Sequence, residues 1–178
     1  MSVRVVYRAL RKKESKQLVE SICSSYPRIC ASAGVGSADV VYEVVSEEDE
    51  VIYVVNGIPV VFKFENQLIP TLVAVKLAGF EALHYATVDE GAVKPVLNGA
   101  DIMAPGIRRV SEFSAGDVVA VWSEDGKTPL AVAKALMTHS EMVSIRRGRA
   151  LKNLHHAGDR IWRLSLEVLK KFEKLQIS

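Results

Sequence analysis

The sequence has little cysteine and no long apolar run, and each shortage excludes a class of protein. Cys23 and Cys30 are the only two cysteines. Their spacing does not fit a CxxC zinc knuckle, and no second Cys or His pair completes four ligands. We therefore expect two free thiols in a reducing compartment and no metal site. No segment approaches the roughly 20 uninterrupted apolar residues that a membrane helix needs.

Recognisable catalytic motifs are missing as well. There is no Gly-rich phosphate loop followed by Lys and Ser or Thr, no GxSxG elbow and no HExxH pair. The first residues alternate basic and apolar side chains, which is not the pattern of a signal peptide. These absences favour a soluble, cytoplasmic protein that is not an enzyme and has no cofactor.

The charges are balanced in number but sorted along the chain. There are 23 basic and 21 acidic residues, giving a net charge of +2. Residues 4–16 are basic, and residues 43–50 are acidic. Further basic clusters follow at residues 108–109 and 146–163. Sorted charges create local potentials that the net charge does not report. Nucleic acid becomes a candidate ligand if the basic clusters converge on one face.

The first half of the chain has the pattern of a small α+β domain. We expect strands at residues 2–7, 40–45, 51–55 and 58–64, and helices at 11–24 and 70–78. Asn56-Gly57 tolerates the positive φ angles of a type I′ turn, so the strands on either side should form a hairpin. Pro27 should end the first helix, and Gly79 should end the second.

The second half has several short strands separated by turns, which favours a compact barrel. We expect strands at residues 84–88, 102–106, 117–122, 129–137 and 161–164, and helices at 89–98, 140–145 and 165–175. Pro95 would remove a hydrogen bond inside the expected helix 89–98, so that helix either has an irregular first turn or begins at Pro95. The expected fold is α+β, with an N-terminal domain over residues 1–82, a pseudo-barrel over 83–164 and a C-terminal helix over 165–178.

Two segments of the second half carry a resemblance to a known module. One is VDEGAVKPVLNGADIMAPG, from Val88 to Gly106, and the other runs from Gly148 to Trp162 and contains NLHH and GDRIW. In this order they resemble the signature of PUA domains, which are named for pseudouridine synthases and archaeosine transglycosylases. This resemblance implies that the second half binds structured RNA.

A looser resemblance extends over nearly the whole chain. The helix ending in Tyr26-Pro27, the Asn56-Gly57 hairpin and the IPTL segment at 69–72 are similar to the malignant-T-cell-amplified-sequence family, its archaeal relatives and the related part of ligatin. That family joins a small pre-PUA domain to a PUA domain. The resemblance implies tRNA or rRNA as ligand, the small ribosomal subunit as partner and a translation-factor partner protein, which is density-regulated protein in eukaryotes. The longer C-terminal tail and Pro95 depart from the family.

The resemblance also indicates where RNA should bind, because PUA domains use the first helix, the glycine turn after it and the adjoining strand. Gly99 lets the backbone approach a phosphate, and the amides of Gly99 and Ala100 could donate to it. Asn98 and Asp101 could recognise an unpaired nucleotide or a 2′-hydroxyl. In the alternative interpretation, Gly99 only ends the helix and Asp101 caps a turn.

Basic residues would supply the contacts to phosphate. The candidates are Lys94, Arg108, Arg109, Arg146, Arg147 and Arg149. The last three lie in an expected loop, and in the alternative interpretation they only make the surface soluble. Other conspicuous side chains are expected in the core: Trp122, Trp162, Met103, Met137 and one of the pair His155 and His156.

Three functions remain open on this pattern. The first is an RNA-binding protein of translation, acting in initiation or recycling. The second is an adaptor that delivers tRNA or rRNA to a separate modification enzyme. The third is a small RNA-modifying enzyme, for which the dense acidic run Glu47, Glu48, Asp49 and Glu50 would be the only polar cluster in the first 80 residues.

Overall fold

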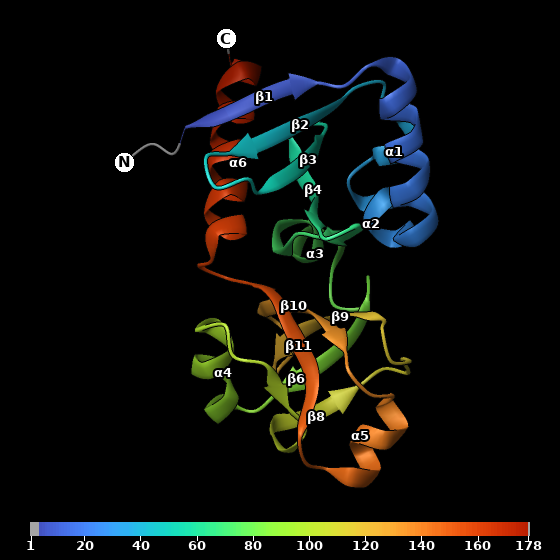
Figure 1. The fold of residues 1–178 in the computed structure, drawn as a ribbon, viewed down its shortest axis with the longest axis vertical. Coiled ribbons are helices and arrows are strands. Elements are labelled where there is room, and N and C mark those ends of the chain that lie inside the picture. Colours follow the sequence, from blue (N-terminus) through green and yellow to red (C-terminus); the bar gives the residue numbers. More distant parts are fainter. Residues whose placement is uncertain (1–3, 178) are drawn as a thin grey trace. The chain divides into compact units, whose positions relative to one another are not determined.

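The computed structural model describes the backbone of residues 4–177 and the side chains of residues 4–174. Ser2 and Val3, the start of the expected first strand, and the side chain of Leu175 lie outside this range. The chain forms two compact units. The first unit comprises residues 1–78 and 160–178, and the second unit comprises residues 79–159 (Figure 1).

The first unit is built on a five-stranded antiparallel sheet whose strands follow one another in chain order. They are β1 (Val5–Ala9), β2 (Val41–Ser46), β3 (Val51–Val55), β4 (Ile58–Phe64) and β5 (Gln67–Pro70). The hairpin expected at Asn56-Gly57 is confirmed, with φ angles of 54° and 76° at these two residues. Val55 pairs with Ile58 across the turn.

Proline sits at the start of one helix and at the end of one strand in this unit. The helices are α1 (Lys12–Ser25), α2 (Pro27–Ser32), a 3-10 turn at Val35–Ser37, α3 (Leu72–Ala78) and α6 (Arg160–Ile177). Pro27 follows α1 as expected and also opens α2, because a proline is tolerated in the first turn of a helix. Pro70 ends β5 instead of opening α3, and the Thr71 hydroxyl caps α3 by accepting from the Ala74 amide at 3.1 Å.

The strand expected at Ile161–Leu164 is wrong, because these residues belong to α6. Ile161, Leu164 and Val168 are buried, and Phe172 packs against the ring of Tyr42 at 5.4 Å. These positions follow the helical spacing of three and four residues. The helix therefore begins nearer the N-terminus, at Arg160, than the expected start at residue 165. The helix contacts β3, β4 and α3. Trp162 therefore lies on a helix and is partly exposed, instead of lying in a barrel strand.

The cysteines also differ from expectation, because Cys23 and Cys30 form a disulfide. Cys23 lies in the last turns of α1 and Cys30 in α2, and the bend between these helices brings their Cα atoms within 4.9 Å. Tyr26 lies at this bend, and its hydroxyl donates to the Leu68 carbonyl at 2.6 Å. Burial raises the pKa of Tyr26 to about 12, so the phenol keeps this hydrogen bond at neutral pH.

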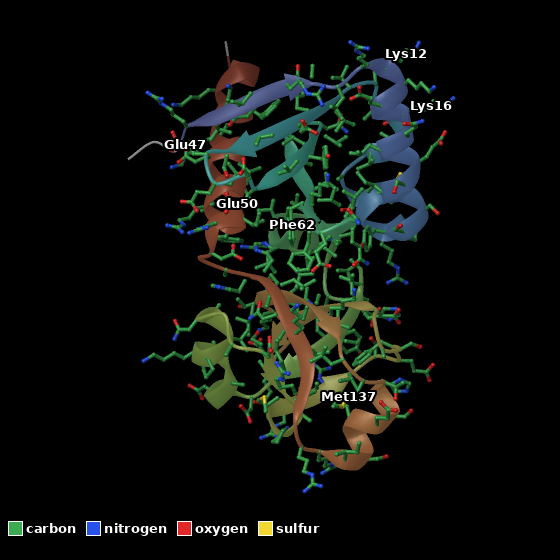
Figure 2. The ribbon with its side chains drawn as sticks, in the orientation of Figure 1. Lys12, Lys16, Glu47, Glu50, Phe62 and Met137 are labelled. Atoms are coloured by element: carbon green, nitrogen blue, oxygen red, sulfur yellow. A yellow bond between two sulfur atoms is a disulfide. The ribbon has the colours of Figure 1, made fainter. Side chains whose placement is uncertain are left out.

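The acidic run forms the turn between β2 and β3, where Glu47 and Glu50 are labelled in Figure 2. Glu48 and Glu50 both form ion pairs with Arg160, at the start of α6, and the Glu50 contact measures 3.6 Å. Glu47 lies 3.9 Å from Arg4. These carboxylates therefore connect the turn to α6 and to Arg4, the residue before β1. Lys12 and Lys16 extend outward from α1 in the same view.

The second unit is a six-stranded sheet with two helices. Its strands are β6 (His84–Val88), β7 (Ile102–Met103), β8 (Ile107–Val110), β9 (Val118–Ser123), β10 (Pro129–Ala135) and β11 (Arg149–His156). They are ordered β7-β11-β10-β9-β6-β8, and β6 and β9 are parallel whereas the other neighbours are antiparallel. The sheet encloses one core that includes Ala86, Val121 and Leu151.

The helices of the second unit are α4 (Glu90–Leu97) and α5 (His139–Ile145). Pro95 lies inside α4, which nevertheless begins at Glu90 with Asp89 as its cap. The Asp89 side chain accepts from the Ala92 amide at 2.9 Å. The helix is thus continuous across the proline. The expected start at Pro95 is therefore wrong, because α4 begins at Glu90.

Most of the side chains expected in the core of the second unit are there. Trp122 is buried and Met137 packs against the core cluster. Met103 is 47% exposed, so its expected burial is wrong. No helix in the described range 4–177 is long and apolar enough to cross a membrane. The same range holds no group of three or more His, Cys, Asp or Glu side chains that could bind a metal ion.

The disulfide should stabilise the first unit measurably. The bridged residues are seven apart, and closing a loop of this size should stabilise the folded state by about 2.5 kcal/mol in the chain-entropy treatment. We expect reductant to lower the urea midpoint of the oxidised protein. The double variant Cys23→Ser, Cys30→Ser should show the lower midpoint with or without reductant. Alkylation of both cysteines in the native protein without reductant would contradict the disulfide.

Candidate nucleic-acid interface

The turn after α4 holds the four residues in which sequence analysis placed RNA recognition. Asn98, Gly99 and Ala100 are exposed, and Gly99 has a φ of +90°, which favours glycine. The Gly99 amide donates to the Val96 carbonyl and the Ala100 amide to the Pro95 carbonyl, both at 3.0 Å. Both amides are therefore used inside the chain. The expectation that they are free to donate to phosphate is wrong for this conformation, and Gly99 does end the helix.

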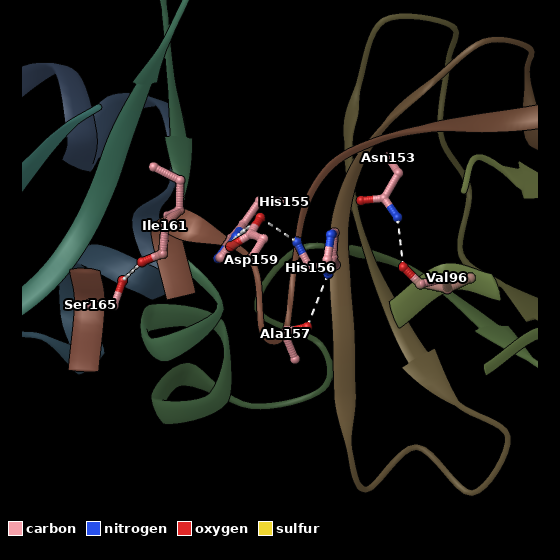
Figure 3. A network of polar contacts seen from close by, with 8 residues as sticks. All are labelled: Val96, Asn153, His155, His156, Ala157, Asp159, Ile161 and Ser165. Atoms are coloured by element: carbon pink, nitrogen blue, oxygen red, sulfur yellow. Dashed lines mark hydrogen bonds and ion pairs between the residues drawn. The ribbon is translucent and has the colours of Figure 1, made fainter. Parts of the chain in front are cut away.

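Asn153 holds this turn in place from the last strand, β11. Its side-chain Nδ2 donates to the Val96 carbonyl at 3.1 Å and to the Ala100 carbonyl at 3.0 Å. Its backbone amide donates to Asp101 Oδ1 at 3.0 Å. Figure 3 shows the contact between Asn153 and Val96. One residue thus fixes the end of α4, the turn and the start of β7.

Asp101 is partly buried and accepts hydrogen bonds from within the protein. Its second oxygen accepts from Arg149 Nη1 at 3.1 Å, across the pair of strands β7 and β11. The Arg149 side chain is still 67% exposed. Asp101 therefore caps the turn and holds the Arg149 guanidinium beside it, where one edge remains open to a phosphate.

His156 lies against the glycine turn, which sequence analysis did not foresee. A Cβ atom on Gly99 would come within 3.3 Å of His156 Nε2. His156 Nδ1 is 3.0 Å from the Ala157 carbonyl, which can only accept, so Nδ1 donates this hydrogen bond. The imidazole ring packs against the turn at Gly99 and is partly exposed.

A β-bulge explains why alternation along β11 did not reveal this arrangement. Val132 pairs with His155 and Ala133 pairs with Asn153, so Leu154 is an extra residue in β11. The bulge brings Asn153 and His156 to the same side, toward the turn. His155 is fully buried, with Nδ1 2.9 Å from Asp159, as expected for one member of the histidine pair (Figure 3).

The two arginines of β8 point in different directions, because successive strand residues face opposite sides. Arg108 Nη2 is 2.9 Å from Asp89. Arg109 lies over the Phe80 ring at 5.5 Å and reaches the Glu124 carbonyl at 3.4 Å. The structure therefore does not bring Arg108 and Arg109 together.

Arg109 adjoins the turn between β9 and β10, which is held by Asp125. The hydrogen bond from the Ser123 hydroxyl, followed by that from the Lys127 amide, lowers the pKa of the Asp125 carboxyl. The carboxylate stays ionised and keeps this turn closed. Arg109 thus contacts Phe80 and the β9–β10 turn.

The other basic candidates fall into two places. Lys94 is exposed on α4, whose last residues lead into the glycine turn, and Arg149 is held at that turn. Arg146 ends α5 in a left-handed conformation with a φ of 51°, and Arg147 follows it. The carbonyl of Gly148 accepts from the Ala104 amide at 2.9 Å, so this loop runs beside the segment after β7.

The contact between Gly99 and His156 can be tested by a double-mutant cycle. Gly99→Ala should destabilise the second unit by about 1–2 kcal/mol, because φ is positive there and the new Cβ meets the imidazole. In a His156→Ala background the steric part of this cost should disappear, leaving only the backbone strain. Urea unfolding of the four proteins measures the coupling. Strictly additive effects would show that the ring does not support the turn.

The comparisons with known proteins agree with this architecture. Residues 84–157 match the model of the PUA domain, and residues 8–77 match a domain of unknown function, DUF1947. The crystal structure of a PUA domain from Aeropyrum pernix K1, solved as a tartrate complex, superposes with a TM-score of 0.80 at 32% identity, covering 93% of this chain and 94% of that one. A hypothetical protein of Pyrococcus horikoshii OT3 superposes with a TM-score of 0.74 at 32% identity, covering 90% and 99%.

Three curated relatives are similar over most of their length. An uncharacterised protein of Methanocaldococcus jannaschii is 41% identical over 67% of this chain and 74% of its own. Translation machinery-associated protein 20 of Saccharomyces cerevisiae is 32% identical over 70% of this chain and 73% of its own. Malignant T-cell-amplified sequence 1-A of Xenopus laevis is 32% identical over 64% and 65%. The chain therefore belongs to the family, with a DUF1947 domain followed by a PUA domain, that contains Translation machinery-associated protein 20 and the malignant T-cell-amplified sequence proteins.

Proposed function

We propose that this protein is a non-catalytic, cytoplasmic RNA-binding protein of the translation machinery. Its ligand is structured RNA, either rRNA of the small ribosomal subunit or tRNA, and its role lies in initiation or recycling. The PUA match supports RNA binding, and the name of the yeast relative supports an association with the translation machinery. A partner protein among the translation factors is part of the same proposal.

The observation that carries this proposal is the immobilised turn after α4. Asn153 makes three hydrogen bonds to the end of α4 and the turn, and Asp101 holds Arg149 at its edge. A binding site needs first contacts that are held in position before the ligand arrives, since ordering them on binding would cost affinity. This turn is exposed and yet fixed, which suits recognition of a folded RNA.

The RNA face that we propose combines the glycine turn with basic side chains of the second unit. Its centre is the turn 98–101 with Lys94 and Arg149, and Arg108, Arg146 and Arg147 lie further along the same unit. The Asn98 side chain is the polar group at the turn that can recognise a base or a 2′-hydroxyl. Arg109 lies outside this face, because its guanidinium is directed toward Phe80.

A binding role also fits the acidic run better than a catalytic one. Glu48 and Glu50 are engaged with Arg160, and Glu47 is near Arg4, so these carboxylates already hold the β2–β3 turn. Glu50 also accepts from the Ser46 hydroxyl. Their position gives a structural reason for the cluster that does not involve RNA chemistry.

Salt dependence should show which arginines and lysines contact phosphate. The logarithm of affinity for tRNA should fall linearly with the logarithm of salt concentration, because bound phosphates release counterions. Lys94→Ala and Arg149→Ala should each reduce this slope by about 1. Arg109→Ala and the exposed Lys63→Ala, in β4, serve as charge-matched controls and should leave the slope unchanged. An equal change of the slope in all four variants would contradict the proposed RNA face.

Sedimentation should decide which RNA-containing particle is bound. We expect the protein to co-migrate with small ribosomal subunits in a sucrose gradient of cell extract, and to leave them at high salt. The Lys94→Ala, Arg149→Ala double variant should move to the top of the gradient. Wild-type protein found only at the top, together with an RNA-modification enzyme, would favour the adaptor role and overturn association with the subunit.

A further inference from the structure

Four basic side chains lie close together at the start of α1, in the first unit. Arg11 precedes the helix, and Lys12, Lys13 and Lys16 belong to its first two turns. All four are exposed. Lys12 and Lys16 are one helical turn apart, and both extend outward from α1 in Figure 2. The proposed RNA face of the second unit uses none of these residues.

The charge of these four side chains is not compensated within the protein. Glu14 is the only acidic residue between Arg11 and Lys16, and it lies 3.8 Å from Arg8. Arg8 also contacts Glu43 at 3.2 Å. Among residues 4–174, no acidic side chain lies within ion-pairing distance of the four basic ones. Their positive charge therefore faces the solvent.

The basic region that the sequence places at residues 4–16 is thus divided into two parts. In the first part, Arg4 lies 3.9 Å from Glu47, and Arg8 is engaged by the carboxylates of α1 and β2. In the second part, from Arg11 to Lys16, the cations have no acidic partner. Such an uncompensated cluster creates a local positive potential that attracts a polyanion.

The surface that surrounds these cations favours RNA over a protein as the partner. The exposed residues further along α1 are polar: Gln17, Glu20, Ser21, Ser24 and Ser25. In the part of the chain that the structure describes, the large hydrophobic side chains that are exposed all lie outside α1. The core of a protein interface is apolar and poor in lysine. Contacts to phosphate, in contrast, need only cations and hydrogen-bond donors.

We propose that the start of α1 is a second RNA-contacting surface, which binds phosphates of the same RNA that the second unit recognises. The three lysines supply point charges, and the Arg11 guanidinium can bind a phosphate through two hydrogen bonds. Phosphate contacts carry no sequence information, so the first unit adds affinity and the glycine turn adds selectivity. This inference rests on the proposed RNA binding. It gives a role to residues 8–77, which match a domain of unknown function.

Replacement of the three lysines by alanine tests this surface, with tRNA and protein-free rRNA of the small subunit as probes. The triple variant Lys12→Ala, Lys13→Ala, Lys16→Ala should reduce the salt-dependence slope by about 2–3 for each RNA that wild-type protein binds. Alanine is the best helix former, so the urea midpoint should not fall. The matched control replaces three exposed lysines of β4 and α6 by alanine and should leave the slope unchanged; they are Lys63, Lys170 and Lys174.

A charge added beside the cluster should act in the opposite direction. Glu20 is exposed one helical turn after Lys16, on the same face of α1. Glu20→Lys should steepen the slope by about 1 and strengthen binding at low salt. Glu20→Gln, which only removes the negative charge, should lie between wild type and Glu20→Lys. Glu173→Lys is the matched control on α6, where Glu173 is also exposed, and it should change neither quantity.

The outcomes distinguish this inference from the proposed function. Wild-type protein that binds neither RNA would overturn RNA binding itself. If wild type binds, an unchanged slope in the α1 triple variant, or an equal reduction in the control, would overturn the α1 surface and leave the face of the second unit standing. Unchanged binding of the variant to protein-free rRNA, with weaker binding to intact subunits, would indicate a protein partner at α1 and overturn the RNA assignment. A reduction confined to the α1 variant would support the inference.

Discussion

The hydrogen bonds of Asn153 are the constraint on which the candidate RNA face depends. The last carbonyls of a helix have no partner within the helix, and in α4 the amides of Asn98, Gly99 and Ala100 take up part of them. Asn153 adds a second hydrogen bond to the Val96 carbonyl, donates to the Ala100 carbonyl and also binds the side chain of Asp101. The residue comes from β11, more than fifty positions later in the chain. The shape of the turn is thus set by the last strand of the second unit, and the bulge at Leu154 gives that strand the required orientation.

Local signals were enough to predict much of the fold. The Asn56-Gly57 hairpin, strand His84–Val88 and the helix capped by Asp89 depend on turn chemistry, capping and short-range periodicity, all of which are present in the sequence. The failures have a common physical origin. The β-branched Ile161 favours a strand locally, yet burial against β3 and β4 makes the segment a helix. The pairing of Cys23 with Cys30 likewise depends on the angle between α1 and α2, which no spacing rule supplies.

The candidate site was predictable as a set of residues but not as a surface. Family resemblance indicated the turn 98–101, and the structure adds which groups there are already committed: the amides of Gly99 and Ala100 to α4, and Asp101 to Arg149 and Asn153. Charge counting treated Arg108 and Arg109 as one cluster, whereas strand alternation separates them. Sequence analysis missed His156 because regular alternation would place Asn153 and His156 on opposite sides of β11. The bulge at Leu154 shifts the alternation and brings His156 to the turn.

The order of residues in the first unit has a consequence for how the protein is made. Strands β1 to β5 leave the ribosome early, but α6, which packs on β3 and β4, comes after the whole second unit. During synthesis the apolar side of the sheet, including the surface at Gly57 that Phe172 later covers, stays uncovered until α6 has been made. The second unit, in contrast, is contiguous and can complete its core as soon as β11 has emerged. The unit that begins the chain is therefore the one that finishes folding last.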